Sequence, residues 1–321
     1  MHLITIGDRV RRADKGIGVA LALVAGVAIS GQARINGQLA VDLGDSMLAA
    51  AISFTGGLAV LALLLPVLPR MRAGVSNIRA ALGSGTLRPW HLLGGLGGAL
   101  MITGQAVTVG VLGVATFTVG VVAGQAASGL VVDRAGLGPA GPRPLSAGRI
   151  VGAVLMLVAV VAGVWGGIAV TGTRAWLMAL PLLAGLAVAV QQAINGRVGA
   201  AARNAMTATL VNFTVGATVL CLAWGVSYLV RGGPEEFPPD PVLYLGGLVG
   251  VAFIALAAFV VRWIGVLMLG LASIAGQLIG SLVLDVVIPT HGGGLAPSTI
   301  GAVAVALVAI GIAALPIRRR S

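Results

Sequence analysis

The side chains best suited to contact a solute are amides that occur twice with the same spacing. The segment Gln-x-x-Ile-Asn-Gly begins at Gln32 and again at Gln191. Residues four apart lie on one face of an α-helix, so Gln32 with Asn36, and Gln191 with Asn195, form two polar patches. Because an amide in lipid is costly without a partner, each patch either lines a solute path or hydrogen-bonds a neighbouring helix.

Other polar side chains stand alone among apolar neighbours. A polar group at membrane depth should face protein or water rather than lipid, which makes these side chains candidates for the wall of a cavity. The candidates are Gln125, Gln277, Gln105, Ser53 and Asn212. Phe54 and Phe213 could line the same path, with packing as the alternative role for each.

Two carboxylates, Asp133 and Asp285, occupy matching places near predicted helix ends. Each is a possible coupling residue for proton transport, and the alternative is an interfacial helix end or a salt bridge to a basic loop. All nine acidic residues lie in loops or near predicted helix boundaries. Coupling through an acid buried at the centre of a helix is therefore disfavoured.

Membrane-spanning helices must position these side chains, because the composition excludes a water-soluble fold. Apolar residues make up 58% of the chain, charged residues 9%, and the mean hydropathy is +1.06. The net charge of +11 does not indicate nucleic-acid binding, since the basic residues fall between apolar runs and aromatic residues are only 4%. The single cysteine, Cys221, allows neither an intramolecular disulfide nor a thiolate metal cluster.

Ten stretches are long and apolar enough to cross a bilayer, which takes about twenty residues of helix. They span residues 17–36, 47–68, 90–110, 114–132, 149–170, 176–195, 206–230, 242–261, 264–284 and 298–317. Very short turns join the third to the fourth and the eighth to the ninth. If the N-terminus is cytoplasmic, 17 of the 20 basic residues lie on the cytoplasmic side, where Lys and Arg are retained. Both termini are therefore predicted to be cytoplasmic.

The second half of the chain repeats the first. An offset of 159 residues aligns the two amide segments and carries Phe54 onto Phe213. At an offset of 152, Pro89 and Gly94-Gly95-Leu96-x-Gly98 match Pro241 and Gly246-Gly247-Leu248-x-Gly250, and Gly124-Gln125 matches Gly276-Gln277. The paired glycines form Gly-x-x-x-Gly patterns, which favour tight packing within the bundle, with a homodimer contact as the alternative.

The repeat defines the predicted organisation of the chain. Residues 1–15 form a cytoplasmic segment, 16–170 a first five-helix repeat and 171–321 a second. Five is an odd number, so the second half must enter the membrane from the side opposite to the first. The predicted fold class is an all-α integral membrane protein with about ten transmembrane helices, arranged as two inverted five-helix repeats.

These segments resemble the drug/metabolite transporter (DMT) superfamily with its EamA/DMT-like fold, and within it the YdcZ-like branch of bacterial inner-membrane proteins. The resemblance covers nearly the whole chain. It rests on Gln-x-x-Ile-Asn-Gly, Phe-Thr-x-Gly and Gly-Gln-x4-Leu-Val-x-Asp, each present once per half. It implies a ten-helix multi-pass carrier in the plasma membrane, an exporter in a fused two-repeat form. Small multidrug resistance proteins of this superfamily use a carboxylate in their first helix, which this sequence lacks, so their proton antiport mechanism is not expected here.

No enzyme motif occurs in the sequence. His2, His91 and His291 lack metal-ligand spacing, and neither Gly-x-Ser-x-Gly nor a phosphate-binding glycine loop is present. We expect no enzyme activity, metal or cofactor. The predicted function is secondary transport of a small metabolite or drug-like solute by alternating access, and the alternatives are a non-transporting membrane scaffold or partner subunit and a membrane enzyme. The expected partners are the solute and the lipid bilayer, with a homodimer as a possibility and no nucleic acid.

Overall fold

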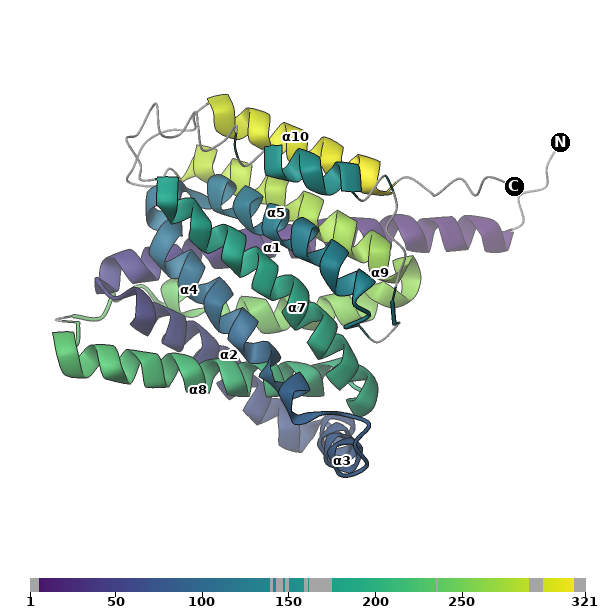
Figure 1. Cartoon of the computed structure of the whole chain (residues 1–321), viewed down its shortest axis with the longest axis horizontal. Helices are drawn as coiled ribbons and strands as arrows, with labels where there is room; N and C mark the ends of the chain where they lie inside the picture. The colour runs from purple at the N-terminus through teal and green to yellow at the C-terminus, as the bar shows by residue number, and fades with distance from the viewer. Residues whose placement is uncertain are drawn as a thin grey trace.

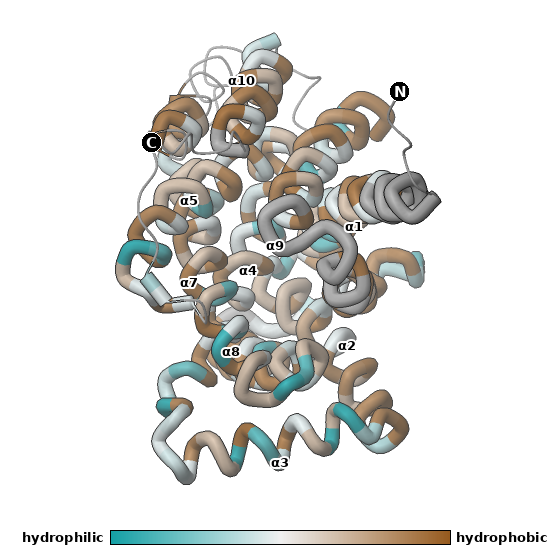
Figure 2. Tube along the Cα trace, turned by 90° about the vertical axis from the view of Figure 1, so that its right-hand side faces the viewer, coloured by the Kyte–Doolittle hydropathy of each residue, from teal (hydrophilic) through white to brown (hydrophobic). Residues whose placement is uncertain are grey.

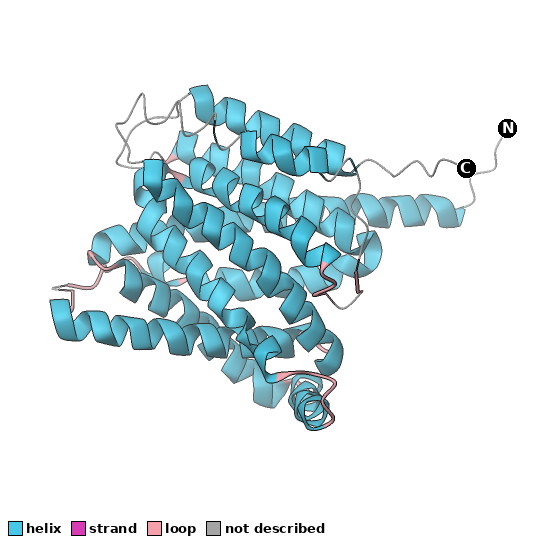
Figure 3. Cartoon of the chain, in the orientation of Figure 1, coloured by secondary structure: helices cyan, strands magenta, loops and turns pink. Residues whose placement is uncertain are grey.

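The computed structural model describes residues 6–138, 141–142, 147, 150–158, 161, 175–234, 236–288 and 297–314. Within these residues every regular element is helical (Figure 3). In chain order the elements are α1 (Ile6–Leu43), α2 (Ser46–Val67), α3 (Pro69–Gly83), η1 (Pro89–Gly94), α4 (Gly95–Leu112), α5 (Val114–Arg134), η2 (Ala175–Met178), α7 (Ala179–Ala202), α8 (Ala205–Arg231), η3 (Pro241–Tyr244), α9 (Gly246–Val287) and α10 (Pro297–Ala314).

Seven helices in the described residues are long and apolar enough to span a bilayer, so the chain is an all-helical multi-pass membrane protein. These spans are Gly16–Leu43, Ser46–Val67, Pro89–Leu112, Val114–Arg134, Trp176–Ala202, Ala205–Val230 and Leu269–Val287. The last predicted helix, 298–317, corresponds to a shorter apolar helix, Pro297–Ile312. Most of the predicted helix 149–170 lies outside the described residues, and the total of ten stays a prediction.

The eighth and ninth predicted helices differ from the structure, because α9 runs as one helix through the expected turn. Both of its ends pack on α1, with Gly250 beside Gln32 and Gly276 beside Leu23. Those two α1 positions lie about 14 Å apart at 1.5 Å per residue, whereas a straight helix from Gly250 to Gly276 would span about 39 Å. The helix α9 therefore bends back, and Figure 1 shows its two arms. The helical path bends without the non-helical break that the sequence predicted.

Between the third and fourth predicted helices, a single residue makes the turn. Gly113 separates α4 from α5 and has φ +79°, a conformation that a residue with a Cβ adopts only under strain. This very short turn was predicted, and it sets the N-terminus of α5 beside the C-terminal end of α9.

The contacts between α1 and α9 recur between α7 and α5 at the repeat offsets. In each case a glycine lets another helix approach so closely that a Cβ would collide with backbone. The pairs are Gly26 with the Ser273 carbonyl and Gly185 with the Val121 carbonyl, then Gly276 with the Leu23 carbonyl and Gly124 with the Leu182 carbonyl. Each contact thus joins one half of the chain to the other, and its counterpart joins the same two halves with the roles exchanged.

The short helix α3 lies across one end of the bundle (Figure 2). Its buried side carries Met71, Gly74 and Ile78, and it is tied to the second half by side chains. The Thr207 hydroxyl donates to the Met71 carbonyl at 3.2 Å, and the Asn77 amide donates to the Ala202 carbonyl at 3.2 Å. The opposite side of α3 is basic, with Arg70, Arg72 and Arg79 exposed.

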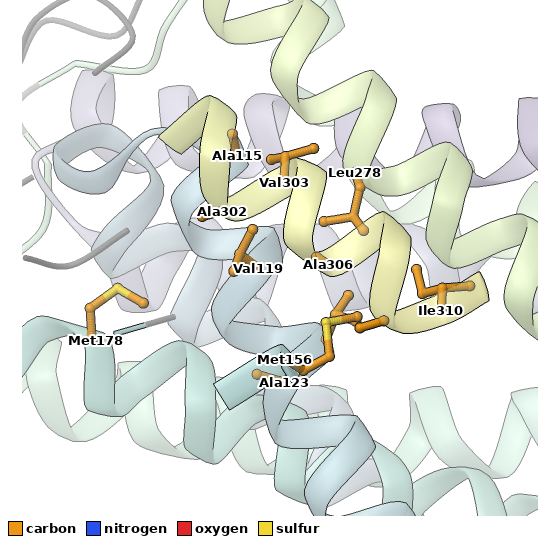
Figure 4. Close-up of a cluster of buried hydrophobic side chains, with 12 residues drawn as sticks. Ala115, Val119, Ala123, Met156, Met178, Leu278, Ala302, Val303, Ala306 and Ile310 are labelled. Carbon is orange, nitrogen blue, oxygen red and sulfur yellow. The ribbon is translucent and has the colours of Figure 1, made fainter. Parts of the chain in front are cut away.

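An apolar cluster packs α10 against α5 and α9 (Figure 4). Small side chains dominate it, which permits close helix packing in a membrane, where dispersion contacts rather than water exclusion drive association. The labelled members from α10 are Ala302, Val303, Ala306 and Ile310, and those from the other two helices include Ala115, Val119, Ala123 and Leu278.

Candidate functional site

The first amide cluster consists of Gln32 and Asn36 from α1, Ser53 from α2 and Gln105 from α4. All four side chains are buried, with exposed fractions of 6%, 0%, 3% and 1% in that order. The Asn36 amide donates to the Gln105 side-chain oxygen at 2.7 Å. The Gln32 amide donates to the backbone carbonyl of Gly246 at 2.8 Å, which joins the first half of the chain to the second.

Part of this cluster has no hydrogen-bond partner among the described residues. The unpartnered atoms are Asn36 Oδ1 and Ser53 Oγ. Both face Gly246, where a Cβ would collide with Asn36 Oδ1 and come within 3.0 Å of Ser53 Oγ. A buried polar atom without a partner costs about 1–3 kcal/mol, so these two atoms, against which Gly246 packs closely, keep a hydrogen-bonding capacity that the described residues do not use.

The second amide cluster consists of Gln191 and Asn195 from α7 with Asn212 from α8. The Asn212 side-chain oxygen accepts from both other amides, at 3.0 Å from Gln191 Nε2 and 3.0 Å from Asn195 Nδ2. Gln191 Oε1 is buried without a partner. At the repeat offset of 159, Asn212 is the equivalent of Ser53. Equivalent positions therefore contribute to both clusters, with a hydroxyl in the first where the second has an amide.

Between the two clusters, Phe54 from α2 stacks on Phe213 from α8. The ring centroids are 4.9 Å apart and the planes differ by 28°. The rings are 4% and 6% exposed. Stacked aromatic pairs contribute about 0.5–1.5 kcal/mol beyond the area that they bury, so this contact is a modest and reversible bond between the halves.

Each ring also lies close to an amide of the opposite half, at a place where a glycine borders both side chains. A Cβ on Gly98 would lie 2.9 Å from the Phe54 ring and 3.2 Å from Gln191 Nε2. Its repeat mate Gly250 has the reciprocal surroundings, with Gln32 Nε2 at 2.9 Å and the Phe213 ring at 3.6 Å. The clusters and rings therefore form one continuous site where the two halves meet.

The two clusters differ in exposure. Gln32 and Asn36 are buried, whereas their repeat mates Gln191 and Asn195 are only half-buried. The first cluster also contains Gln105, whose counterpart at the offset of 152 is Ala257. In this conformation the α1 side of the site is sealed more completely than the α7 side.

Gln125 and Gln277 lie at the helix crossings and are not described partners of the amide clusters. Their backbone nitrogens sit at the close helix crossings, Gln125 beside Gly185 and Gln277 beside Gly26. The Gln277 carbonyl also accepts from the Ser30 hydroxyl at 2.7 Å. No described hydrogen bond joins either side chain to an amide cluster, so a role for them in the solute path stays a prediction.

Asp285 caps a helix of the other half. Its carboxylate accepts from the backbone N–H groups of Val114 at 3.0 Å and Ala115 at 2.7 Å, at the N-terminus of α5. A carboxylate there satisfies free N–H groups and interacts favourably with the helix dipole. Asp133 lies in the last turn of α5. A coupling role for either acid stays a prediction.

Glycines contribute to the site in a way that the sequence pattern does not predict. The Gly-x-x-x-Gly patterns of Gly94, Gly98, Gly246 and Gly250 predict packing within the bundle, which the structure confirms, and the structure adds their contacts with the amides. Gly94 faces Asn195, as Gly246 faces Asn36. A signal for these contacts is present in the sequence, because the glycines and the amides both recur in the repeat. Among the described residues no group of three His, Cys, Asp or Glu side chains could hold a metal ion.

Apolar spanning helices, with buried amides where the two halves meet, define a polytopic membrane protein. Comparison with known families identifies it further. The chain belongs to the family described as "Putative inner membrane exporter, YdcZ", whose model matches residues 17–162 and 176–314. Two matched stretches are consistent with a two-repeat protein of the DMT superfamily, and the family is one of membrane exporters rather than of enzymes.

A solved crystal structure has a similar fold. It aligns over 96% of this chain and 99% of its own, with a TM-score of 0.50 and 21% sequence identity, and this likeness concerns the fold alone. No curated protein sequence matches the chain.

Proposed function

We propose that this protein is a secondary transporter that exports a small metabolite or drug-like solute across the bacterial inner membrane by alternating access. One observation carries the proposal: amides that are repeat mates lie on either side of a stacked Phe54–Phe213 pair, at the junction of the two halves. A site shared between repeats is the usual place for solute binding in secondary transporters.

The reciprocal contacts support a mechanism in which the halves exchange roles. We propose ten transmembrane helices in two inverted five-helix repeats, so that the first cluster lies toward the outside and the second toward the cytoplasm. Gln191 and Asn195 are more exposed than their buried repeat mates, so this conformation represents one that faces the cytoplasm. Rocking one half against the other would seal the second cluster and expose the first.

The energetics of the site suit such an exchange. The halves are joined here by single hydrogen bonds, such as Gln32 to the Gly246 carbonyl, and by one aromatic stack. Neutral hydrogen bonds contribute about 0.5–1.5 kcal/mol each in net terms. Few such bonds need to break at once at the site, and the glycine crossings of α1 with α9 and of α7 with α5, which also join the halves, would have to slide during the exchange.

The proposed orientation of the protein in the membrane follows from the positions of its arginine residues. Arg88 follows α3 in the chain, and Arg203 follows Ala202, whose carbonyl accepts from Asn77 of α3. On the same helix as Ala202, Arg197 donates to the Gly136 and Leu137 carbonyls just beyond Arg134. We propose that the end of the bundle with α3 and both termini are cytoplasmic, as the retention of basic residues on that side requires.

Solute flux is the test of this proposal against the alternative, a membrane scaffold that retains the repeat fold. Purified protein in liposomes should release a preloaded labelled solute from a broad metabolite panel faster than protein-free liposomes do. We expect saturable release of at least one solute and its competition by the unlabelled compound. If no solute is released while the protein binds another membrane protein stoichiometrically, the carrier proposal is wrong and the scaffold alternative stands.

A further inference from the structure

Neither amide cluster makes a described contact with a charged side chain. The described polar partners within them are amide groups, the Ser53 hydroxyl and the Gly246 carbonyl. We infer that the solute is uncharged, and that it joins a planar apolar body to an amide or similar hydrogen-bonding group. This inference rests on the proposed function and names the class of solute that the same site would accept.

Arg34, the charged residue closest in sequence to the first cluster, projects away from it. Arg34 lies two residues from Gln32 and two from Asn36, so it is rotated by about 200° from each around the axis of α1. Its charge interacts with the Asp285 carboxylate, which also accepts the two N–H groups of α5. Neither group is a described partner of the first cluster.

His91 is the titratable residue closest in sequence to the glycines of the second cluster. Its ring is 4% exposed, and its Nδ1 accepts a hydrogen bond from the backbone N–H of Arg88 at 3.0 Å. A ring nitrogen that accepts a hydrogen bond carries no proton, so the imidazole in this arrangement is neutral. It supplies no charge to balance an anionic solute. Arg197, two residues beyond Asn195, donates instead to the Leu137 and Gly136 carbonyls.

A charged solute would therefore lose its hydration without gaining a counter-charge. Burying an unpaired charge is far more costly than burying a polar group that finds a hydrogen bond. The unpartnered ends of Asn36, Ser53 and Gln191 offer that hydrogen bond. A primary amide suits them because it has donors and an acceptor, and so can pair with either end of another amide.

The aromatic pair indicates the chemistry of the apolar part of the solute. Phe54 and Phe213 lie against the amides of opposite halves, so their rings separate when the halves rock apart. A flat apolar group can then stack on a ring and replace the contact that was lost. An aryl group that bears an uncharged amide meets both requirements.

Three compounds of nearly equal shape test the charge requirement: neutral benzamide, cationic benzamidinium and anionic benzoate. The readout is the Tm of detergent-purified full-length protein over a concentration series, because a ligand of the native state raises the apparent stability. Neutral benzamide and its ring-substituted neutral amides should stabilise the protein, with benzamidinium and benzoate binding about 100-fold more weakly or worse. Gln32→Ala should abolish the stabilisation by benzamide.

The matched control is Gln38→Ala on the same helix, because Gln38 bonds the exposed Asp42 and not the site. It should bind benzamide as the unaltered protein does. Stabilisation by benzamidinium or benzoate that Gln32→Ala removes would overturn the inference, as would the failure of every neutral amide in the series. If charged solutes then proved to be released from liposomes, the inference would be wrong and the transport function would stand.

Discussion

Gly26→Val is expected to destabilise the protein more than any other single change considered in this chain. A Cβ on Gly26 would collide with the Ser273 carbonyl and lie 2.8 Å from the Gln277 backbone nitrogen. Both are backbone atoms of α9, which cannot move aside as a flexible side chain can. The helices must separate, at a cost of about 3 kcal/mol or more, and the Tm should fall by roughly 5 °C or more.

The control for this change lies one and a half turns further along α1. Beyond the adjacent backbone of α1 itself, no atom lies within 4 Å of a Cβ built on Gly31, so Gly31→Val should leave the Tm nearly unchanged. Gly185→Val tests the repeat, because its Cβ would meet the Val121 carbonyl in the reciprocal crossing. We expect it to match Gly26→Val, and equal stability of the Gly26 and Gly31 variants would show that α1 does not pack on α9 as described.

Asn36→Ala and Asn195→Ala are expected to slow solute release from liposomes by about tenfold to hundredfold each. Asn36→Ala removes the donor to Gln105 and a ligand of the site, and Asn195→Ala removes a donor to Asn212. Losing one hydrogen bond to a buried polar group costs about 1–3 kcal/mol, which corresponds to this range of rates.

The two variants should differ in stability although both lose transport. Asn36 is fully buried and its loss leaves the Gln105 oxygen unpaired, so Asn36→Ala should also lower the Tm. Asn195 is half-buried and the Asn212 oxygen keeps Gln191 as a donor, so Asn195→Ala should have the Tm of the unaltered protein. If the Asn195→Ala variant released solute at the normal rate, the second cluster would not lie on the solute path.

Much of this structure could be predicted from the sequence because apolar length and internal repetition are local signals. The repeat alone pairs Gln32 with Gln191 and Phe54 with Phe213. It could not show that Phe54 meets Phe213, because an offset says which residues are equivalent and not which are in contact. The cap made by Asp285 on α5 likewise depends on how the halves dock.

The course of α9 shows a second kind of feature that could not be predicted from the sequence. The stretch around Arg262 and Gly265 interrupts the apolar pattern, which favoured a break between two helices. Helix geometry tolerates a sharp bend when backbone hydrogen bonds are lost over only a turn or so, and composition does not distinguish a bend from a break. The place of the Gln125 and Gln277 side chains in the solute path stays a prediction, because only their backbone nitrogens are described at the helix crossings.

Alternating exposure of the two clusters is the central claim, and cysteine accessibility measures it most directly. In a Cys221→Ala background, Ser53→Cys and its repeat mate Asn212→Cys place one thiol in each cluster, at positions that are 3% and 4% exposed here. A membrane-impermeant maleimide should label the first only from the outside and the second only from the cytoplasm. A transported solute should change the two labelling rates in opposite directions. Labelling of both thiols from the same side, or parallel changes in both rates, would contradict alternating access.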